Sequence, residues 1–158
     1  MGPDGDDMAP VAPVVRAATA ADKAAIAALI VFLAEDFDGH TTVSQDWIVE
    51  CLGDDDFSAL VAELDGEVVG VVTWTLVRGL FHGKKSAVVQ EASVAPAFRD
   101  RGIGRALLTE ALTRIEAQDV AEISISTGFE NERAMHLYRS LGFVDETLLL
   151  EQHLESDA

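Results

Sequence analysis

The segment "FSALVAELDGEVVGVVTWTLV", residues 57–77, constrains the fold of this chain more than any other. Two runs rich in β-branched and other apolar residues flank Asp65-Gly66, and an Asp-Gly pair between such runs is typical of a two-residue hairpin turn. A third β-rich run, "SAVVQEASVA", follows after a short loop and stops before Pro96. Three consecutive strands joined in this way predict an antiparallel arrangement in this part of the sheet.

Helical patterns surround these strands. Thr19 and Asp22 have the spacing of a capping box, and Ser44 is placed to cap a second, short helix. The expected order is strand (13–19), helix, helix, three strands, helix, strand (121–127), helix (131–142) and strand (143–154). This order indicates an α/β protein with a mixed sheet, as one domain over residues 13–158 after a disordered tail at 1–12.

The net charge of the chain argues against two classes of binding partner. Its formal net charge is −17, which argues against nucleic-acid binding and against an anionic membrane surface, because both need many Lys and Arg side chains. No apolar run reaches the roughly 18 residues of a membrane span, and no secretory signal is recognisable at the start, so a cytoplasmic protein is expected. Cys51 is the only cysteine, and no spacing of His, Cys or acidic residues indicates a metal site.

Against this acidic background, "RDRGIGRALL" at residues 99–108 concentrates three arginines and two glycines. A strand precedes it and a helix follows, so the free N–H groups and the dipole of the helix N-terminus favour an anion there. Glycines let the backbone approach that anion closely. The spacing is neither that of a P-loop nor that of a dinucleotide fingerprint. An anion site is weighed above the alternative of a plain loop with surface arginines.

Two motifs give the chain a family resemblance. "RDRGIG" at residues 99–104 matches the R/Q-x-x-G-x-G/A signature of the GCN5-related N-acetyltransferases, and "NERAMHLYRSLGF" at residues 131–143 resembles their second motif. The resemblance covers most of residues 14–150. It implies acetyl-CoA as the acyl donor, on a mixed and mostly antiparallel sheet that is flanked by helices and splayed between its fourth and fifth strands.

The resemblance also implies where the donor binds. The pyrophosphate would lie on the glycine loop, and the pantetheine arm would pair with the preceding strand as an added strand does. The backbone N–H near Val94 would stabilise the oxyanion of the thioester carbonyl. Asn131 is first the cap of its helix, and in relatives the matching residue also contacts the donor. The implied binding residues are Ala92, Ser93, Val94, Arg99, Asp100, Arg101, Gly102, Ile103, Gly104, Arg105 and Asn131.

Acetyl transfer to an amine also requires two proton movements. A primary amine has a pKa of about 10.4 and must be deprotonated, while the departing thiolate needs a proton. Glu91 is the candidate base, acting through water, and strict alternation predicts that it shares a face with Val89 and Ser93. A solvent-facing acid is the alternative. Tyr138 is the candidate general acid, and a tyrosine that only packs in the core is its alternative.

The acceptor is the least constrained part of the prediction. Acidic segments such as "EDFDGH" and "GDDDF" suit a cationic small-molecule amine, for example a polyamine or an aminoglycoside; an acidic surface that only aids solubility is weighed slightly higher. Trp47, Trp74 and Phe81 are candidate pocket residues, and His40 and His82 fall in loops that would border the site. A protein N-terminal or lysine acetyltransferase and a non-catalytic acyl-CoA-binding module remain alternatives. A homodimer stays open.

Overall fold

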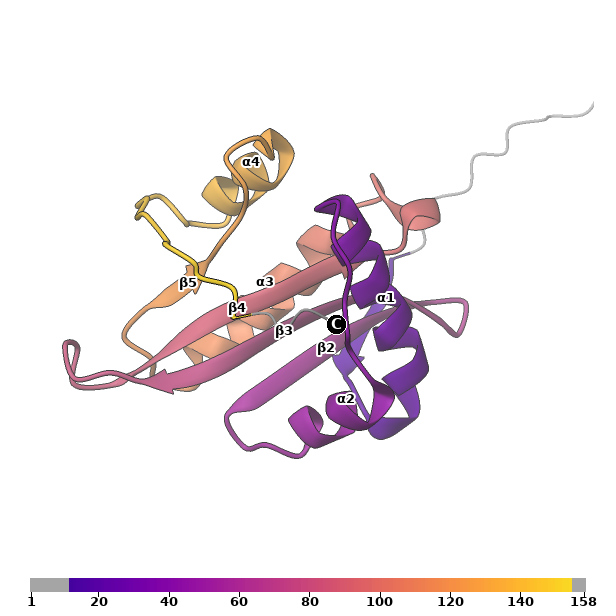
Figure 1. Ribbon diagram of the computed structural model, residues 1–158, viewed down its shortest axis with the longest axis horizontal. Helices are drawn as coiled ribbons and strands as arrows, with labels where there is room; N and C mark the ends of the chain where they lie inside the picture. The colour runs from indigo at the N-terminus through magenta and orange to yellow at the C-terminus, as the bar shows by residue number, and fades with distance from the viewer. Residues whose placement is uncertain (1–11, 155–158) are drawn as a thin grey trace, which may run out of the picture. The chain divides into compact units, whose positions relative to one another are not determined.

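The computed structural model describes residues 12–154, and its central element is a mixed sheet in the order β1-β2-β3-β4-β5. Each neighbouring pair is antiparallel except β4 and β5, which are parallel. The expectation of an α/β protein with a mostly antiparallel sheet is therefore confirmed (Figure 1). The strands are β1 (Val14–Ala17), β2 (Phe57–Leu64), β3 (Glu67–Arg78), β4 (Lys85–Val94) and β5 (Ile123–Ile125).

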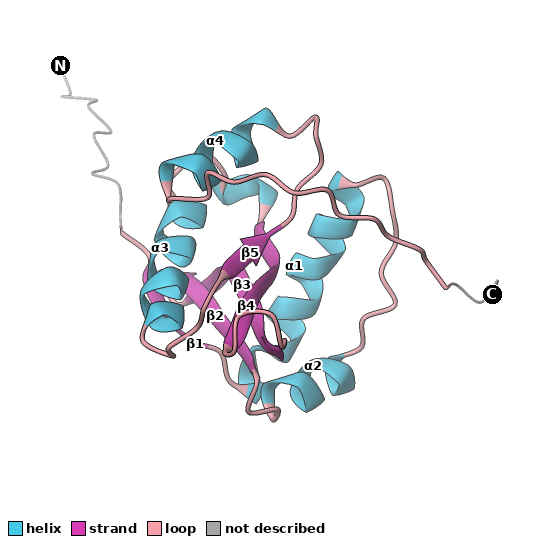
Figure 2. Cartoon of the chain, turned by 90° about the vertical axis from the view of Figure 1, so that its left-hand side faces the viewer, coloured by secondary structure: helices cyan, strands magenta, loops and turns pink. Residues whose placement is uncertain are grey.

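Helices cover both faces of this sheet. Figure 2 shows α1 and α2 on one face and α3 on the other, and contacts of α1 with β3 and β4 and of α3 with β2 and β3 agree. The helices are α1 (Lys23–Asp36), α2 (Gln45–Leu52), α3 (Ile103–Glu116) and α4 (Glu132–Ser140), with 3-10 turns at Ala20–Asp22 and Pro96–Phe98.

Their boundaries follow the predicted caps. The backbone N–H of Thr19 donates to the Asp22 carboxylate at 2.8 Å, and the Ser44 hydroxyl accepts from the Trp47 N–H at 3.1 Å.

The hairpin and the core follow from the apolar pattern. Leu64 pairs with Glu67 across the Asp65-Gly66 turn, as predicted. On the α1 face the buried side chains form a cluster of Ile26, Leu29, Ile48, Val61 and Val71. On the other face α3 buries an apolar stripe of Ile103, Leu107, Leu108, Ala111 and Ile115.

Strand β4 contains an irregularity that the sequence did not reveal. Trp74 pairs with Val89 while the adjacent Thr73 pairs with Glu91, so Gln90 is an extra residue that forms a β-bulge. Paired residues share a face, and Thr73 and Trp74 lie on opposite faces of β3. The prediction that Glu91 shares a face with Val89 is therefore wrong, because the bulge reverses the alternation between them. Glu91 does share its face with Ser93.

The chain divides into two compact units, one ending at Ile125 and one beginning at Ser126, and each is described by itself. The second unit holds α4. The strand expected at residues 143–154 is not formed: within the described residues, 143–154 contain neither helix nor strand. A β-rich run becomes a strand only through ladder hydrogen bonds to a partner, and no such ladder is formed by this segment. The expected tail, residues 1–12, lies outside the described residues except for Ala12.

In the described part of the chain, no helix is both long and apolar enough to cross a bilayer.

Candidate functional site

Within the described residues, the C-terminal half of β4 has no strand partner on its β5 side, and this part of β4 is called its open edge below. Pairing with β5 covers only residues 87–89 and ends at the Val89–Ile125 pair, although β4 continues to Val94. This confirms the expectation that pairing between the fourth and fifth strands stops partway. The Ala95 N–H donates to the Val69 carbonyl at 2.9 Å; by alternation, the N–H and C=O groups of Ala92 and Val94 point away from β3.

The N-terminus of α3 follows β4 after the 3-10 turn Pro96–Phe98, and its N-cap residue makes no side-chain cap. Gly102 is the N-cap, with φ of +79°, and it has no side chain to accept from the first-turn N–H groups. A Cβ on Gly104 would lie 3.9 Å from the nearest atom, on Val94, so no neighbouring protein atom requires a glycine there. First-turn N–H groups of a helix can bind an anion such as a phosphate, and the anion site expected here stays a prediction.

The three arginines of the motif have different surroundings. The Arg99 guanidinium donates to both oxygens of Asp36, at 3.2 and 2.9 Å, and its Nε donates to the Val94 carbonyl at 2.9 Å. The Arg101 guanidinium lies over the Phe98 ring, 5.4 Å from its centroid. Arg105 is exposed on the first turn of α3. Direct contact of any of them with a phosphate stays a prediction.

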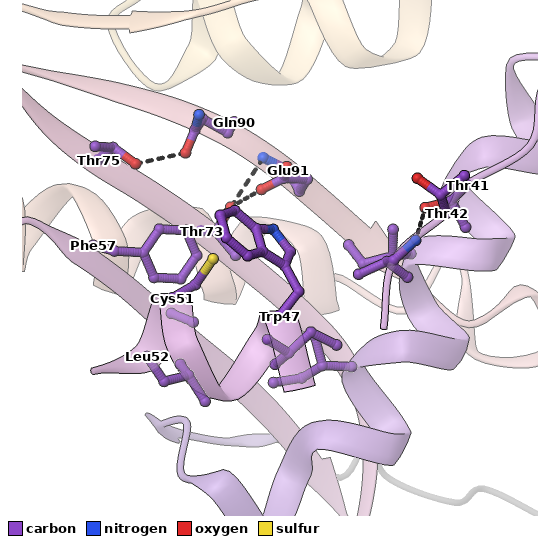
Figure 3. A pocket seen from close by; sticks show the side chains of 15 residues that line it. Thr41, Thr42, Trp47, Cys51, Leu52, Phe57, Thr73, Thr75, Gln90 and Glu91 are labelled. Carbon is purple, nitrogen blue, oxygen red and sulfur yellow. Dashed lines mark hydrogen bonds between the residues drawn. The ribbon is translucent and has the colours of Figure 1, made fainter. Parts of the chain in front are cut away.

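A cavity of about 600 Å³ lies on the α1 and α2 face of the sheet. It is called the acceptor cavity below, after the role proposed for it under Proposed function. Figure 3 shows the Trp47 indole, the Phe57 ring and the Cys51 thiol directed into the same space as Thr73 and Glu91. The half-buried Glu91 carboxylate accepts a hydrogen bond from the Thr73 hydroxyl. That hydroxyl in turn accepts from the Glu91 backbone N–H at 3.2 Å.

Two other polar side chains near Glu91 are not suited to attack a substrate. The buried Ser93 hydroxyl donates to the Leu29 carbonyl at 2.8 Å. Ser93 pairs with Val71, and by alternation its backbone N–H and C=O groups point toward β3. Burial, followed by the nearby carboxylates of Glu50 and Glu91, raises the pKa of the Cys51 thiol. A raised pKa keeps Cys51 mostly in the less reactive thiol form.

Of the aromatic candidates, only Trp47 lines the acceptor cavity. Trp74 is buried, and its indole N–H donates to Gln118, just beyond α3, at 3.3 Å. Phe81 is 93% exposed in the loop between β3 and β4.

Neither of the two loop histidines, His40 and His82, is among the residues that line this cavity. His82 Nε2 lies 3.3 Å from Glu122. Among the described residues, no cluster of three or more His, Cys, Asp or Glu side chains is arranged to hold a metal ion.

Sequence reasoning missed the cavity residues that come from β2 and β3. Thr73 partners Glu91 through the strand register, and Phe57 reaches the cavity from the start of β2. The alternation of the hairpin strands could have placed Thr73 and Phe57 on one face of the sheet. That Glu91 lies on the same face depends on the bulge. One residue of each acidic segment is in an ion pair: Asp36 pairs with Arg99, and Asp56 pairs with Lys85 at 2.7 Å.

The second unit carries the remaining predicted residues. The Asn131 side chain accepts from the Ala134 N–H at 3.1 Å, which confirms it as the cap of α4. The Tyr138 ring packs edge-to-face against Phe143, with centroids 6.2 Å apart. Burial raises the pKa of the Tyr138 phenol above its ordinary value. Its role as a general acid stays a prediction.

Comparisons with known proteins agree with this architecture. The chain is 34% identical over 83 residues to the N-acetyltransferase family 8 member 3 of Rattus norvegicus, which covers 52% of this chain and 36% of the rat protein. It is 29% identical over 118 residues to an N-alpha-acetyltransferase of Sulfurisphaera tokodaii, 70% of this chain and 71% of that protein. The chain thus spans about a third of the length of the rat relative.

A solved structure shows the same fold. An aminoglycoside acetyltransferase from an uncultured soil metagenomic sample, in complex with sisomicin, superposes with a TM-score of 0.76 at 17% identity, over 92% of this chain and 97% of that one. The model of the Acetyltransferase (GNAT) family matches residues 24–143, which include both sequence motifs. The chain therefore belongs to the Acetyltransferase (GNAT) family, as its motifs predicted.

Proposed function

We propose that this chain is an acetyl-CoA-dependent N-acetyltransferase that moves an acetyl group to the primary amine of a small molecule. One observation carries the proposal: the open edge of β4 leads within a few residues into the uncapped N-terminus of α3. The amides of a pantetheine arm can pair with the open edge of β4, and a pyrophosphate can bind at the N-terminus of α3. Glu91 lies on the same strand and faces a cavity large enough for a small acceptor.

In this proposal the backbone holds the donor. The N–H and C=O groups of Ala92 pair with the pantetheine amides, the Val94 N–H faces the thioester carbonyl, and the first-turn N–H groups of α3 bind the pyrophosphate. Arg101 and Arg105 add positive charge at the same end of the helix. Gly104 keeps this approach open, which accounts for a glycine that no protein contact requires.

The reaction is a direct transfer. The neutral amine attacks the thioester carbonyl carbon, a C–N bond forms, and the C–S bond breaks as the thiolate leaves. Glu91 accepts the amine proton through water, and the Val94 N–H stabilises the oxyanion. Tyr138 returns a proton to the thiolate, a role that the family resemblance implies. A phenol is protonated at neutral pH, as this role requires, and burial shifts the pKa of Tyr138 further upward.

The test measures donor binding and turnover separately. Calorimetry measures the Kd for acetyl-CoA, and release of CoA thiol measures turnover with a panel of amines. We expect Glu91→Gln to lower kcat by about 100-fold while the Kd for acetyl-CoA changes by less than about twofold. Glu67→Gln, which removes a carboxylate at the exposed start of β3, is the matched control. Donor binding without turnover on any amine refutes the enzyme and supports a non-catalytic acyl-CoA-binding module.

A second candidate acceptor is the α-amine of a peptide. The relative in Sulfurisphaera tokodaii, an N-alpha-acetyltransferase, favours it. A peptide with a free N-terminus therefore belongs in the amine panel. A kcat/KM for this peptide that exceeds those of all the small amines supports the second candidate.

A further inference from the structure

Within the proposed function, on which this inference rests, we propose that the acceptor is a monoamine with an apolar body rather than a polycation. The apolar body occupies the acceptor cavity and the amine points toward Glu91. The geometry that supports this is the composition of the cavity walls together with the position of the surrounding charges.

The walls are mostly apolar. Of the fifteen residues that line the cavity, nine are apolar side chains or the Cys51 thiol, five are neutral polar residues, and Glu91 is the single charged one. The apolar residues come from α1, α2, β2 and the loop between α1 and α2. The threonines of β3, Gln90 and Glu91 lie together on the sheet, and Thr41 and Thr42 lie on the far side of the cavity from Thr75 and Gln90 (Figure 3). An elongated molecule with one charged end matches this division.

The many acidic residues of the chain do not change this picture. Asp36 and Asp56 are paired with Arg99 and Lys85, and neither lines the cavity. The carboxylates of Glu50 and Asp54 are close enough to raise the pKa of Cys51, but neither residue lines the cavity. A polyamine or an aminoglycoside would bring several ammonium groups into a space whose lining offers one carboxylate. Each further ammonium would lose water without gaining a charged partner, and such a loss is costly.

Apolar burial gives the expected size of the preference. Each methylene moved from water into an apolar site improves binding by up to about fourfold. Hexylamine and 1,5-diaminopentane form a matched pair, because the diamine replaces the terminal methyl of hexylamine with an ammonium group at nearly the same length. We expect kcat/KM for hexylamine to exceed that for the diamine by at least about tenfold.

Substitutions in the wall test whether the cavity sets this preference. Trp47→Ala removes an exposed cavity wall, and we expect it to lower kcat/KM for hexylamine about tenfold while leaving the Kd for acetyl-CoA unchanged. Val49→Ala is the matched control, because Val49 lies on the same helix and does not line the cavity. Gln90→Glu adds a second carboxylate at nearly constant volume. We expect it to raise kcat/KM for 1,5-diaminopentane relative to kcat/KM for hexylamine.

The single cysteine reports occupancy without turnover. Cys51 lines the cavity, so hexylamine should slow its labelling by N-ethylmaleimide at pH 7 more than 1,5-diaminopentane does, as measured by intact mass. Hexylamine preferred in both assays supports the inference. Turnover that favours the diamine, sisomicin or a peptide overturns it and leaves the acetyltransferase proposal standing. If acetyl-CoA binds but no amine is acetylated, the proposed function fails. In that case the labelling of Cys51 tests the inference by itself. If the two amines slow the labelling equally, or if neither slows it, the inference is overturned as well.

Discussion

Arg99 begins the glycine signature, yet in the structure its guanidinium joins the end of α1 to the end of β4. It makes a two-pronged contact with Asp36 and donates from Nε to the Val94 carbonyl. Val94 belongs to the open edge that the proposal assigns to pantetheine. We therefore predict that Arg99 supports donor binding by fixing this edge of β4, and that it is not a direct ligand of the pyrophosphate.

The two roles differ in the size of the effect. The Arg99 and Asp36 side chains are 37% and 45% exposed, and an ion pair that is this exposed contributes about 0.2–1 kcal/mol, or up to about fivefold in a binding constant. A charge-assisted hydrogen bond to phosphate contributes about 1.5–3 kcal/mol, or roughly 10- to 150-fold. The supporting role thus predicts a modest loss, and the ligand role predicts a large one.

Asp36→Asn separates the two roles more sharply than Arg99→Ala alone. If Arg99 fixes the edge, both substitutions weaken acetyl-CoA binding, each by up to about fivefold, and the double variant is no weaker than Arg99→Ala. If Arg99 binds phosphate, removing Asp36 releases it, so Asp36→Asn leaves binding equal or tighter. Asp38→Asn, in the turn after α1, corrects for the general loss of a negative charge. Calorimetric Kd values decide, and a loss above about 30-fold for Arg99→Ala with none for Asp36→Asn refutes the supporting role.

Three further predictions concern stability and chemistry. Asp22 is 6% exposed and accepts a hydrogen bond from Arg16 at 2.8 Å. Asp22→Ala should therefore lower the free energy of unfolding, measured in urea at pH 7, by about 2–4 kcal/mol. The hydrogen bond from Arg16 is the main cause that lowers the pKa of Asp22, so the difference from wild type should shrink as the pH falls below about 4; a pH-independent difference contradicts this role. Gly70→Ala would place a Cβ 2.9 Å from a side chain of α3 and should lower the free energy of unfolding by about 1–3 kcal/mol, whereas Gly79→Ala, with no atom within 4 Å, should not; equal unfolding curves would exclude the close packing. Tyr138→Phe should reduce kcat far more than it changes the Kd for acetyl-CoA, and the raised pKa of Tyr138 predicts no alkaline loss of wild-type activity below about pH 10. An unchanged kcat removes Tyr138 from the mechanism.

Local patterns predicted most of the fold because each relied on neighbours in sequence. The Asp65-Gly66 turn, the Ser44 cap and the apolar stripe of α3 are all set by a few consecutive residues. The strand expected at residues 143–154 failed for the opposite reason. Its composition favours a strand, but a strand also needs a partner at the right register, and nothing within the segment specifies one.

The candidate site was predictable to the same degree. The glycine loop could be proposed as an anion site from residues 99–105, because the backbone of one continuous segment would form such a site. The acceptor cavity could not, because its wall joins α1, α2 and three strands. The arginine cluster suggested phosphate contacts for Arg99, whereas its partner Asp36 lies 63 residues away in sequence, beyond any spacing rule.

The bulge at Gln90 shows why the step from sequence to site needs the strand register. Gln90 has no glycine or proline character, so its identity gives no sign of an extra residue. Without it, Glu91 would share a face with Val89 and would point toward the α3 side of the sheet. With it, Gln90 and Glu91 both line the acceptor cavity, and the bulge directly follows the last residue that pairs with β5. One inserted residue thus places an acid in the cavity where the open edge of β4 begins, so that the carboxylate and the edge proposed for the donor lie on one short segment.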